Sequence, residues 1–308
     1  MFLWALIVGL SFPIVGLMSE GLPPLLLTAI RFGIAAVAIL PLIGRTIDYR
    51  PSFQGFALYA VMGLALAGFF GVMFWAAHRT SALSMATIYV SVPLLAYLLG
   101  RLIGVERRAV RLVSILAVGA VGALALSWAE SAGGPGYLHF GVGEFAFFIG
   151  CIASALYPVL SKWGLNRGLL SNRAEVRTFW SLLTGGVLIG LAGLIIEDPR
   201  QLSSITLLDG ALLTYLGVFS SGVTFWLMQR ATTLLAPSVV SSYSYLVPFV
   251  SMLLLFIAEP ASVGWRWLPG IFLVVLAIGL LLRRDIAKTS SRPATSLTET
   301  SSHAVSIQ

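Results

Sequence analysis

The amino-acid sequence predicts an all-α integral membrane protein, with ten transmembrane helices in two inverted five-helix repeats around a central cavity. Three observations lead to this fold class. The 308 residues are 58% hydrophobic and 10% charged, with a mean hydropathy of +0.95, which is more apolar surface than a soluble core of this size could bury. A long motif occurs twice, and basic residues gather in alternate loops. The 31 glycines fit the same class, because small residues let membrane helices approach closely.

Ten apolar segments follow one another along the chain. Each holds about 17–24 residues, roughly the length that a helix needs to cross a hydrocarbon core. Alternating strand patterns are absent from them, which disfavours a β-barrel. The first segment has no basic leader and no small-residue cleavage site, so we expect a retained helix rather than a signal peptide. The expected spans are residues 1–18, 22–43, 53–76, 83–103, 109–128, 143–163, 175–196, 206–228, 236–257 and 267–283.

The repeated motif occupies residues 74–93 and 225–248. Both copies begin with Phe-Trp and end at a proline. An arginine stands five residues after the phenylalanine in each copy, at Arg79 and Arg230, and a segment rich in Ser and Thr follows it. A repeat of this length indicates a duplicated fold of two halves.

The distribution of basic residues predicts the orientation. If both termini are cytoplasmic, 15 of the 19 Lys and Arg residues lie on the cytoplasmic side, among them Arg177 and Arg230 in loops. Only Arg79, Arg200 and Arg266 lie outside, and Arg31 lies within a span. This asymmetry favours a multi-pass protein of the inner (plasma) membrane with that orientation. Because five is odd, the second half enters the membrane from the opposite side, as in many secondary transporters.

The same patterns divide the chain into four parts. We expect a first five-helix repeat over residues 1–128, an outer linker over 129–142 and a second five-helix repeat over 143–285. Residues 286–308 are rich in Ser and Thr and poor in large apolar groups. Such a segment cannot bury enough surface to order itself, so a disordered cytoplasmic tail is predicted.

Several local features resemble one known family. An Arg31-Phe32 pair follows a helix-opening proline in the second span, the first copy of the motif is followed by Gly-Val-Glu-Arg-Arg, and Glu259 is placed much as Glu106 is. In these features the chain, from residue 1 to about 285, is similar to the ten-helix EamA-type branch of the drug/metabolite transporter (DMT) superfamily. The resemblance implies two inverted five-helix repeats, a central cavity, alternating access, and export or exchange of amino acids and similar metabolites.

The prolines that end the two motif copies point to a substrate cavity. Pro93 and Pro248 are expected inside their helices, where each would leave free the carbonyl group four residues earlier. In a membrane such a group must be satisfied, often in a cavity. Hydroxyl and aromatic side chains share the faces of these helices and suit a small zwitterion, although they could equally only pack helices together. The predicted cavity residues are Tyr89, Pro93, Tyr97, Ser241, Ser244, Tyr245, Pro248, Trp75, Trp226 and Arg31.

Arg31 and three further residues complete the candidate set. A charge at a helix centre costs about 2.5–3.5 kcal/mol, so Arg31 is expected to bind a substrate carboxylate, or else to reach the outer interface or pair with Glu20. Pro13 and Pro158 are expected to be paired hinges, or alternatively fixed bends. His78 is a candidate for proton coupling, or simply a solvated helix-end residue.

Other classes of protein lack their residues here. One cysteine and three widely spaced histidines provide neither a disulfide framework nor a metal site, and no cofactor is expected. The catalytic and nucleotide-binding motifs of membrane enzymes and ATP-driven pumps are absent. The basic residues lie between apolar spans, which indicates contact with the lipid bilayer and a small-molecule substrate rather than nucleic acid. The expected function is a secondary transporter, not an enzyme, moving amino acids or related compounds by alternating access as an exporter or exchanger. The alternatives are import of a carboxylate or vitamin-like compound, flipping of a lipid-linked sugar, a non-transport structural subunit, or a membrane-embedded enzyme.

Overall fold

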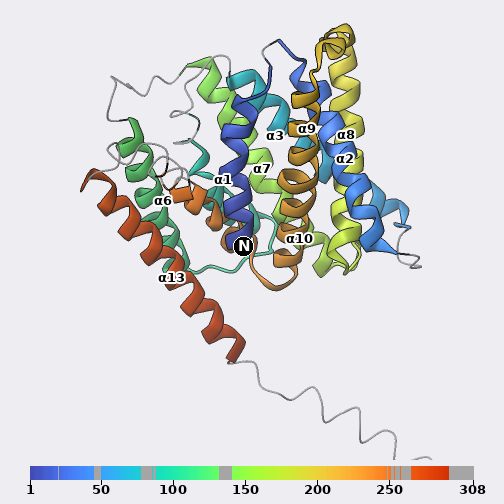
Figure 1. Ribbon diagram of the computed structural model, residues 1–308. Coiled ribbons are helices and arrows are strands. Elements are labelled where there is room, and N and C mark those ends of the chain that lie inside the picture. The colour runs from blue at the N-terminus through green and yellow to red at the C-terminus, as the bar shows by residue number, and fades with distance from the viewer. Residues whose placement is uncertain are drawn as a thin grey trace, which may run out of the picture.

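The regular structure in the described part of the chain is entirely helical (Figure 1). A computed structural model describes residues 1–19, 21–44, 50–77, 85, 88–131, 141–247, 249–250, 253, 257 and 265–290. Six described helices are long and apolar enough to cross a membrane, and three more are apolar but shorter. Each predicted span except 236–257 contains one of these nine helices. The all-helical membrane fold is therefore confirmed, and ten remains the predicted number of spans.

The helices follow one another with short connections. The first half contains α1 (Phe2–Gly16), α2 (Pro24–Ile43), α3 (Phe53–Ala77), α5 (Val92–Leu102) and α6 (Val110–Ser131). The second half contains α7 (Val142–Asn166), α8 (Ala174–Ile196), the 3-10 helix η2 (Pro199–Ser204), α9 (Leu207–Tyr215), the π-helix η3 (Leu216–Val223), α10 (Thr224–Leu234), α11 (Pro237–Ser242), the 3-10 helices η4 (Tyr243–Leu246) and η6 (Trp265–Trp267), and α13 (Leu268–Ser290).

Four sequence-based assignments need correction. The rod formed by α9, η3 and α10 extends to Leu234 rather than to residue 228, so Arg230 is helical and not in a loop. Arg177 also lies in a helix, α8, and its side chain is fully buried. Pro93 occupies the first turn of α5 and not the interior of a helix. The last helix continues to Ser290, which is beyond the predicted end of the second repeat at residue 285.

Helices that hold corresponding positions in the two predicted halves pack against each other. The helix α2 packs along α8, α6 packs along α13, and α5 packs on α11. In Figure 1 the α6–α13 pair lies at one edge of the bundle and the α2–α8 pair at the other. This is the pairing that a pseudo-two-fold axis between the halves would give.

Two apolar clusters fill the bundle. The larger cluster joins α2, α3, α5, α7, α8 and α10, and the smaller cluster joins α1, α6, α11, η4 and α13. Long apolar side chains on the outer surfaces, such as those of Val37, Val121 and Ile195, are exposed. Exposed apolar side chains of this kind are what a helix surface facing lipid would carry.

Charged side chains of α8 and its flanks bind both ends of α2. The carboxylate of Glu197 accepts hydrogen bonds from the backbone N–H groups of Leu25 (2.8 Å) and Leu26 (2.9 Å) at the N-terminus of α2. At the other end, the guanidinium of Arg173 donates to the carbonyl groups of Ile43 and Leu42, both at 2.9 Å. These groups would otherwise lack intrahelical partners, and each charge has the sign that complements the helix dipole.

Glu106 forms a similar contact between α5 and α11. Its carboxylate accepts hydrogen bonds from the backbone N–H and the hydroxyl of Ser238, both at 2.8 Å. The carboxylate therefore caps the first turn of α11 from the end of α5. In this way a residue of the first half fixes the start of a helix in the second half.

Glycine lets α3 approach α8 closely. A Cβ atom at Gly63 would collide with Thr184 Oγ1 and would lie 2.5 Å from the backbone nitrogen of Gly185. Since backbone cannot move aside without shifting the helix, we expect Gly63→Val to destabilise the protein by about 1–3 kcal/mol or more. Thermal unfolding in detergent, followed by size-exclusion chromatography of the surviving folded fraction, measures this change.

Gly33→Val in α2 is the matched control for this variant, because a Cβ atom at Gly33 would meet nothing within 4 Å. Both substitutions put the same β-branched residue in a helix interior, so the difference between them reports the crowding alone. Equal thermal stability of the two variants would contradict the close packing of α3 on α8.

Candidate functional site

A buried arginine links α2 to the π-helix η3. Arg31 is 6% exposed. Its Nε donates to the hydroxyl of Ser221 at 2.6 Å, and its Nη2 donates to the hydroxyl of Ser220 at 2.7 Å and more weakly to the Ser220 carbonyl at 3.4 Å. The guanidinium carbon lies 5.1 Å from the centre of the Phe70 ring. Neutral oxygens and an aromatic face therefore surround a positive charge within the membrane-spanning bundle.

The π-helix explains how Ser220 and Ser221 both reach Arg31. A π-helical turn contains an extra residue, which changes the direction of the following side chains, and such turns are frequent at functional sites. Glycine at position 217 is needed as well, because a Cβ atom there would lie 2.6 Å from Ile34 Cγ2 and 3.2 Å from the Arg31 carbonyl oxygen. The small residues of η3 thus bring the serines within hydrogen-bonding distance of α2.

One edge of the Arg31 guanidinium is not used by the described residues. Within that part of the chain its Nη1 has no hydrogen-bond partner, and no carboxylate contacts the group. Glu20, the alternative partner considered from the sequence, lies outside the described residues. A guanidinium recognises a carboxylate or phosphate through two parallel N–H groups. Arg31 is thus suited to bind an anionic group.

Aromatic rings continue from Arg31 into the bundle. Phe70 packs edge-on against Phe32 (5.3 Å between ring centres) and lies 6.3 Å from Phe225. Phe225 packs in turn on Tyr157, at 5.6 Å. The path connects α2, α3, α10 and α7, so the charge of Arg31 is next to an apolar and aromatic surface.

A second buried arginine organises the other end of this path. Arg177 is fully buried, and its guanidinium donates to Gln229 Oε1 (2.9 Å), to the Gln229 carbonyl (2.7 Å) and to the Ser171 carbonyl (2.6 Å). Ser161 donates to the same Gln229 Oε1 at 2.6 Å. Tyr157 shares a 2.9 Å hydrogen bond with Ser181. The network ties α7, α8 and α10 together.

Four buried polar atoms have no hydrogen-bond partner among the described residues. Buried polar groups are nearly always paired with protein or water. Two of the atoms belong to predicted cavity residues, which supports the interest of this region for a polar ligand. They are Ser91 Oγ, Gln229 Nε2, Ser244 Oγ and Tyr245 OH.

The structure separates the two tyrosines that the sequence placed on one helical face. Because α5 begins at Val92, no continuous helix joins Tyr89 to Tyr97. Tyr89 lies in the larger apolar cluster, with its ring centre 5.8 Å from that of Phe69. Tyr97 lies in the smaller cluster, and its hydroxyl accepts a hydrogen bond from the backbone N–H of Ala109 at 3.1 Å.

The other predicted residues are distributed as follows. Ser241, Ser244 and Tyr245 are buried together in α11 and η4, and a Cβ atom at Gly119 would lie 2.5 Å from the Tyr245 ring. Pro158 lies in the interior of α7, and Pro13 lies within α1. His78 and Pro248 fall outside the described residues.

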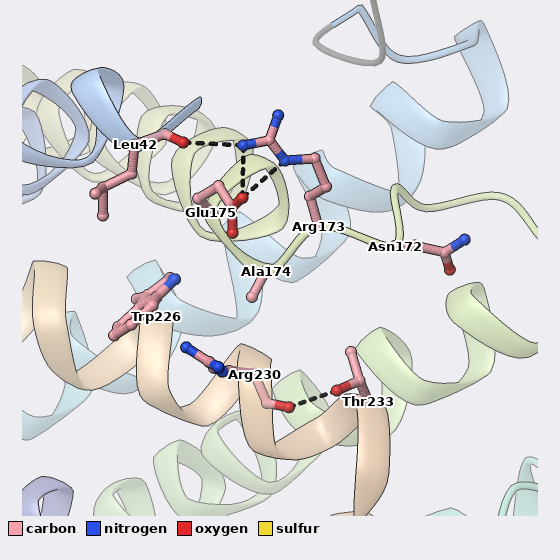
Figure 2. Close-up of a pocket in the computed structure, with 8 residues that line it drawn as sticks. All are labelled: Leu42, Asn172, Arg173, Ala174, Glu175, Trp226, Arg230 and Thr233. Carbon is pink, nitrogen blue, oxygen red and sulfur yellow. Dashed lines mark hydrogen bonds and ion pairs between the residues drawn. The ribbon is translucent and has the colours of Figure 1, made fainter. Parts of the chain in front are cut away.

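The two tryptophans of the repeated motif line two different pockets. Trp75 borders an apolar pocket of about 700 Å³ between the N-terminus of α2, the C-terminus of α8 and α3. Trp226 borders a pocket of about 400 Å³ between the C-terminus of α2, the N-terminus of α8 and α10 (Figure 2). If α2 and α8 exchange roles, as the inverted repeat requires, the two pockets occupy equivalent places at opposite ends of the bundle.

The sequence-based reasoning missed three residues of this region, and each had a signal. Arg177 falls inside the predicted span 175–196 and should have counted as a basic residue within a span. Ser220 and Ser221 form a polar pair in the middle of an apolar segment, where hydroxyl groups need a partner. Their joint contact with Arg31 depends on the π-helix, for which the sequence carried no pattern.

An apolar helical bundle with buried arginines and duplicated halves defines the chain as a membrane transporter. The sequence profile of the EamA-like transporter family matches residues 1–128 and 141–283. The protein therefore belongs to the EamA-like transporter family, which is part of the DMT superfamily.

Individual relatives and a solved structure agree with this assignment. The "Uncharacterized inner membrane transporter YedA" of Escherichia coli strain K12 is 27% identical over 252 residues, covering 80% of this chain and 77% of the relative. YedA of E. coli O157:H7 gives the same values. A solved structure described as "Crystal structure of protein" has a TM-score of 0.70 at 19% identity and covers 91% of this chain and 93% of that chain. The last comparison concerns the fold alone.

Proposed function

We propose that the protein is a secondary transporter that moves small carboxylate-bearing metabolites, namely amino acids or related compounds, by alternating access as an exporter or exchanger. The observation that carries the proposal is the environment of Arg31. Its guanidinium is buried, is held by Ser220 and Ser221, and has an unused edge among the described residues. A substrate carboxylate at this edge would supply the missing negative charge through charge-assisted hydrogen bonds.

The aromatic residues next to Arg31 support the remainder of the assignment. Phe70, Phe32 and Phe225 present an apolar and aromatic surface to a side chain or carbon skeleton, and such a surface with a few polar anchors is typical of small-molecule sites. In this proposal the unpartnered hydroxyls of Ser244 and Tyr245 bind polar groups when the helices rearrange. Pro13 and Pro158 act as the paired hinges, and His78 remains the candidate for coupling.

Counterflow in proteoliposomes tests the proposal. Vesicles are loaded with one unlabelled amino acid at a time, and entry of the labelled compound is followed. We expect saturable accumulation for amino acids whose carboxylate is free, and little accumulation for the corresponding amino-acid amides, which keep the amine and the side chain. Equal counterflow of acid and amide would contradict the role of Arg31 in carboxylate binding.

Import of a carboxylate or vitamin-like compound is the second candidate, because a guanidinium binds carboxylates without an amino group equally well. Monocarboxylates and dicarboxylates in the same panel separate the two candidates. Counterflow by these compounds without counterflow by amino acids would favour the second candidate.

A further inference from the structure

The pocket beside Trp226 contains a guanidinium that no other described residue neutralises. Figure 2 shows Arg230 beside Trp226, with Arg173 and Glu175 on the opposite wall. Arg173 forms an ion pair with Glu175 at 2.7 Å, so the charges of these two residues compensate each other. In the described part of the chain Arg230 has neither an ion pair nor a side-chain hydrogen bond, and its guanidinium carbon lies 5.5 Å from the centre of the Trp226 ring. The pocket therefore has a net positive charge.

The repeated motif explains the geometry of this guanidinium. Arg230 follows Trp226 by four residues in α10, and side chains at this spacing lie above one another on a helix. The indole face supports the guanidinium and leaves its N–H groups directed away from the ring, as is typical of arginines that bind planar anions. The first copy of the motif has the same spacing between Trp75 and Arg79.

The position of the pocket in the bundle indicates which anion it would meet. It lies where α2 ends, α8 begins and α10 ends, which is the end predicted to face the cytoplasm. Lys162 also lies there, and its ammonium group donates to the carbonyls of Thr232 and Thr233 at 2.9 Å. Basic pockets between transmembrane helices at this depth bind phosphate head groups of anionic lipids. A volume of about 400 Å³ falls within the range of small-ligand sites.

We propose that this pocket is a phosphate-binding site in which Arg230, supported by Trp226, holds a phosphate group at the predicted cytoplasmic end of the bundle. The phosphate group belongs either to an anionic lipid head group or to a free phosphate compound. The site is distinct from Arg31, and it does not depend on the substrate that Arg31 binds.

Lipid binding to the purified full-length protein tests the site. The protein is reconstituted in nanodiscs of phosphatidylcholine and phosphatidylglycerol, and the lipids that stay bound after extraction are counted by native mass spectrometry. We expect the wild type to retain phosphatidylglycerol in preference to phosphatidylcholine, and Arg230→Gln to lower that preference about tenfold, because charge-assisted hydrogen bonds are lost. Inorganic phosphate is then added as a competitor.

Arg167→Gln is the matched control. Arg167 also stacks on a tryptophan four residues earlier, at 4.4 Å from the Trp163 ring, but it does not line the pocket. We expect this variant to retain the wild-type lipid preference. Release of phosphatidylglycerol by inorganic phosphate would assign the site to free phosphate compounds as well, whereas retention would assign it to the head group. Loss of lipid preference in Arg167→Gln equal to that in Arg230→Gln, or no effect of Arg230→Gln on either probe, would overturn the proposal.

Discussion

Replacing Arg31 by glutamine is expected to lower the counterflow kcat/KM for amino acids by about 100-fold. The substitution removes the charge that would bind the substrate carboxylate, and hydrogen bonds between charged groups contribute about 1.5–3 kcal/mol each. Transport of amino-acid amides, which carry no carboxylate, should change much less. The ratio of the two rates in proteoliposomes is therefore the quantity to measure.

Two further variants separate substrate binding from folding at this site. Arg31→Lys keeps the charge but cannot reproduce the paired contacts to Ser220 and Ser221, and we expect an intermediate rate. Ser221→Ala removes the 2.6 Å hydrogen bond to Nε and should loosen the guanidinium without removing its charge. If Arg31→Gln instead lowers only the folded fraction and leaves the acid-to-amide ratio unchanged, Arg31 is a structural residue.

The second large effect is expected at Arg177. Arg177→Met removes all three hydrogen bonds from a fully buried side chain to Gln229 and Ser171, and the carbonyl groups left behind lose their donor. We expect a loss of stability of about 3 kcal/mol, since breaking one side of a buried polar network is far more costly than losing a surface contact. Thermal inactivation in detergent and the folded fraction after purification measure the loss.

A double variant shows whether the network itself causes this loss. In Arg177→Met with Gln229→Leu, both partners are replaced by apolar groups, which should recover part of the lost stability. Arg107→Met is the control, because Arg107 is an exposed arginine. A double variant no more stable than Arg177→Met alone, or an Arg107→Met variant just as unstable, would contradict the assigned role of Arg177.

The fold class could be predicted because the bilayer leaves few choices for an apolar chain. A segment of about 20 apolar residues must satisfy its backbone internally and so becomes a helix, which explains why the span 22–43 agrees with α2 within two residues. The candidate site was predicted less completely. Arg31 was recognised because a charge in a span stands out, but its serine partners lie about 190 residues away and meet it only through tertiary packing.

Pro93 and Arg177 show why the remainder was missed. A proline in an apolar run either bends a helix or begins one, and local sequence does not distinguish the two cases; here Pro93 lies in the first turn of α5. An arginine near the end of an apolar span usually reaches the polar interface. Arg177 turns inward because Gln229 and Ser171 offer oxygen acceptors, and those acceptors come from other elements.

The contacts at the two ends of α2 have a consequence for motion. Glu197 and Arg173, which flank α8, hold α2 at opposite ends of the membrane, and the two helices belong to different predicted halves. Sliding or separation of the pair would break hydrogen bonds to charged groups at one end or both. The α2–α8 seam therefore behaves like the spine of a book, and a route across the membrane opens by movement of the helices on the far side of that spine.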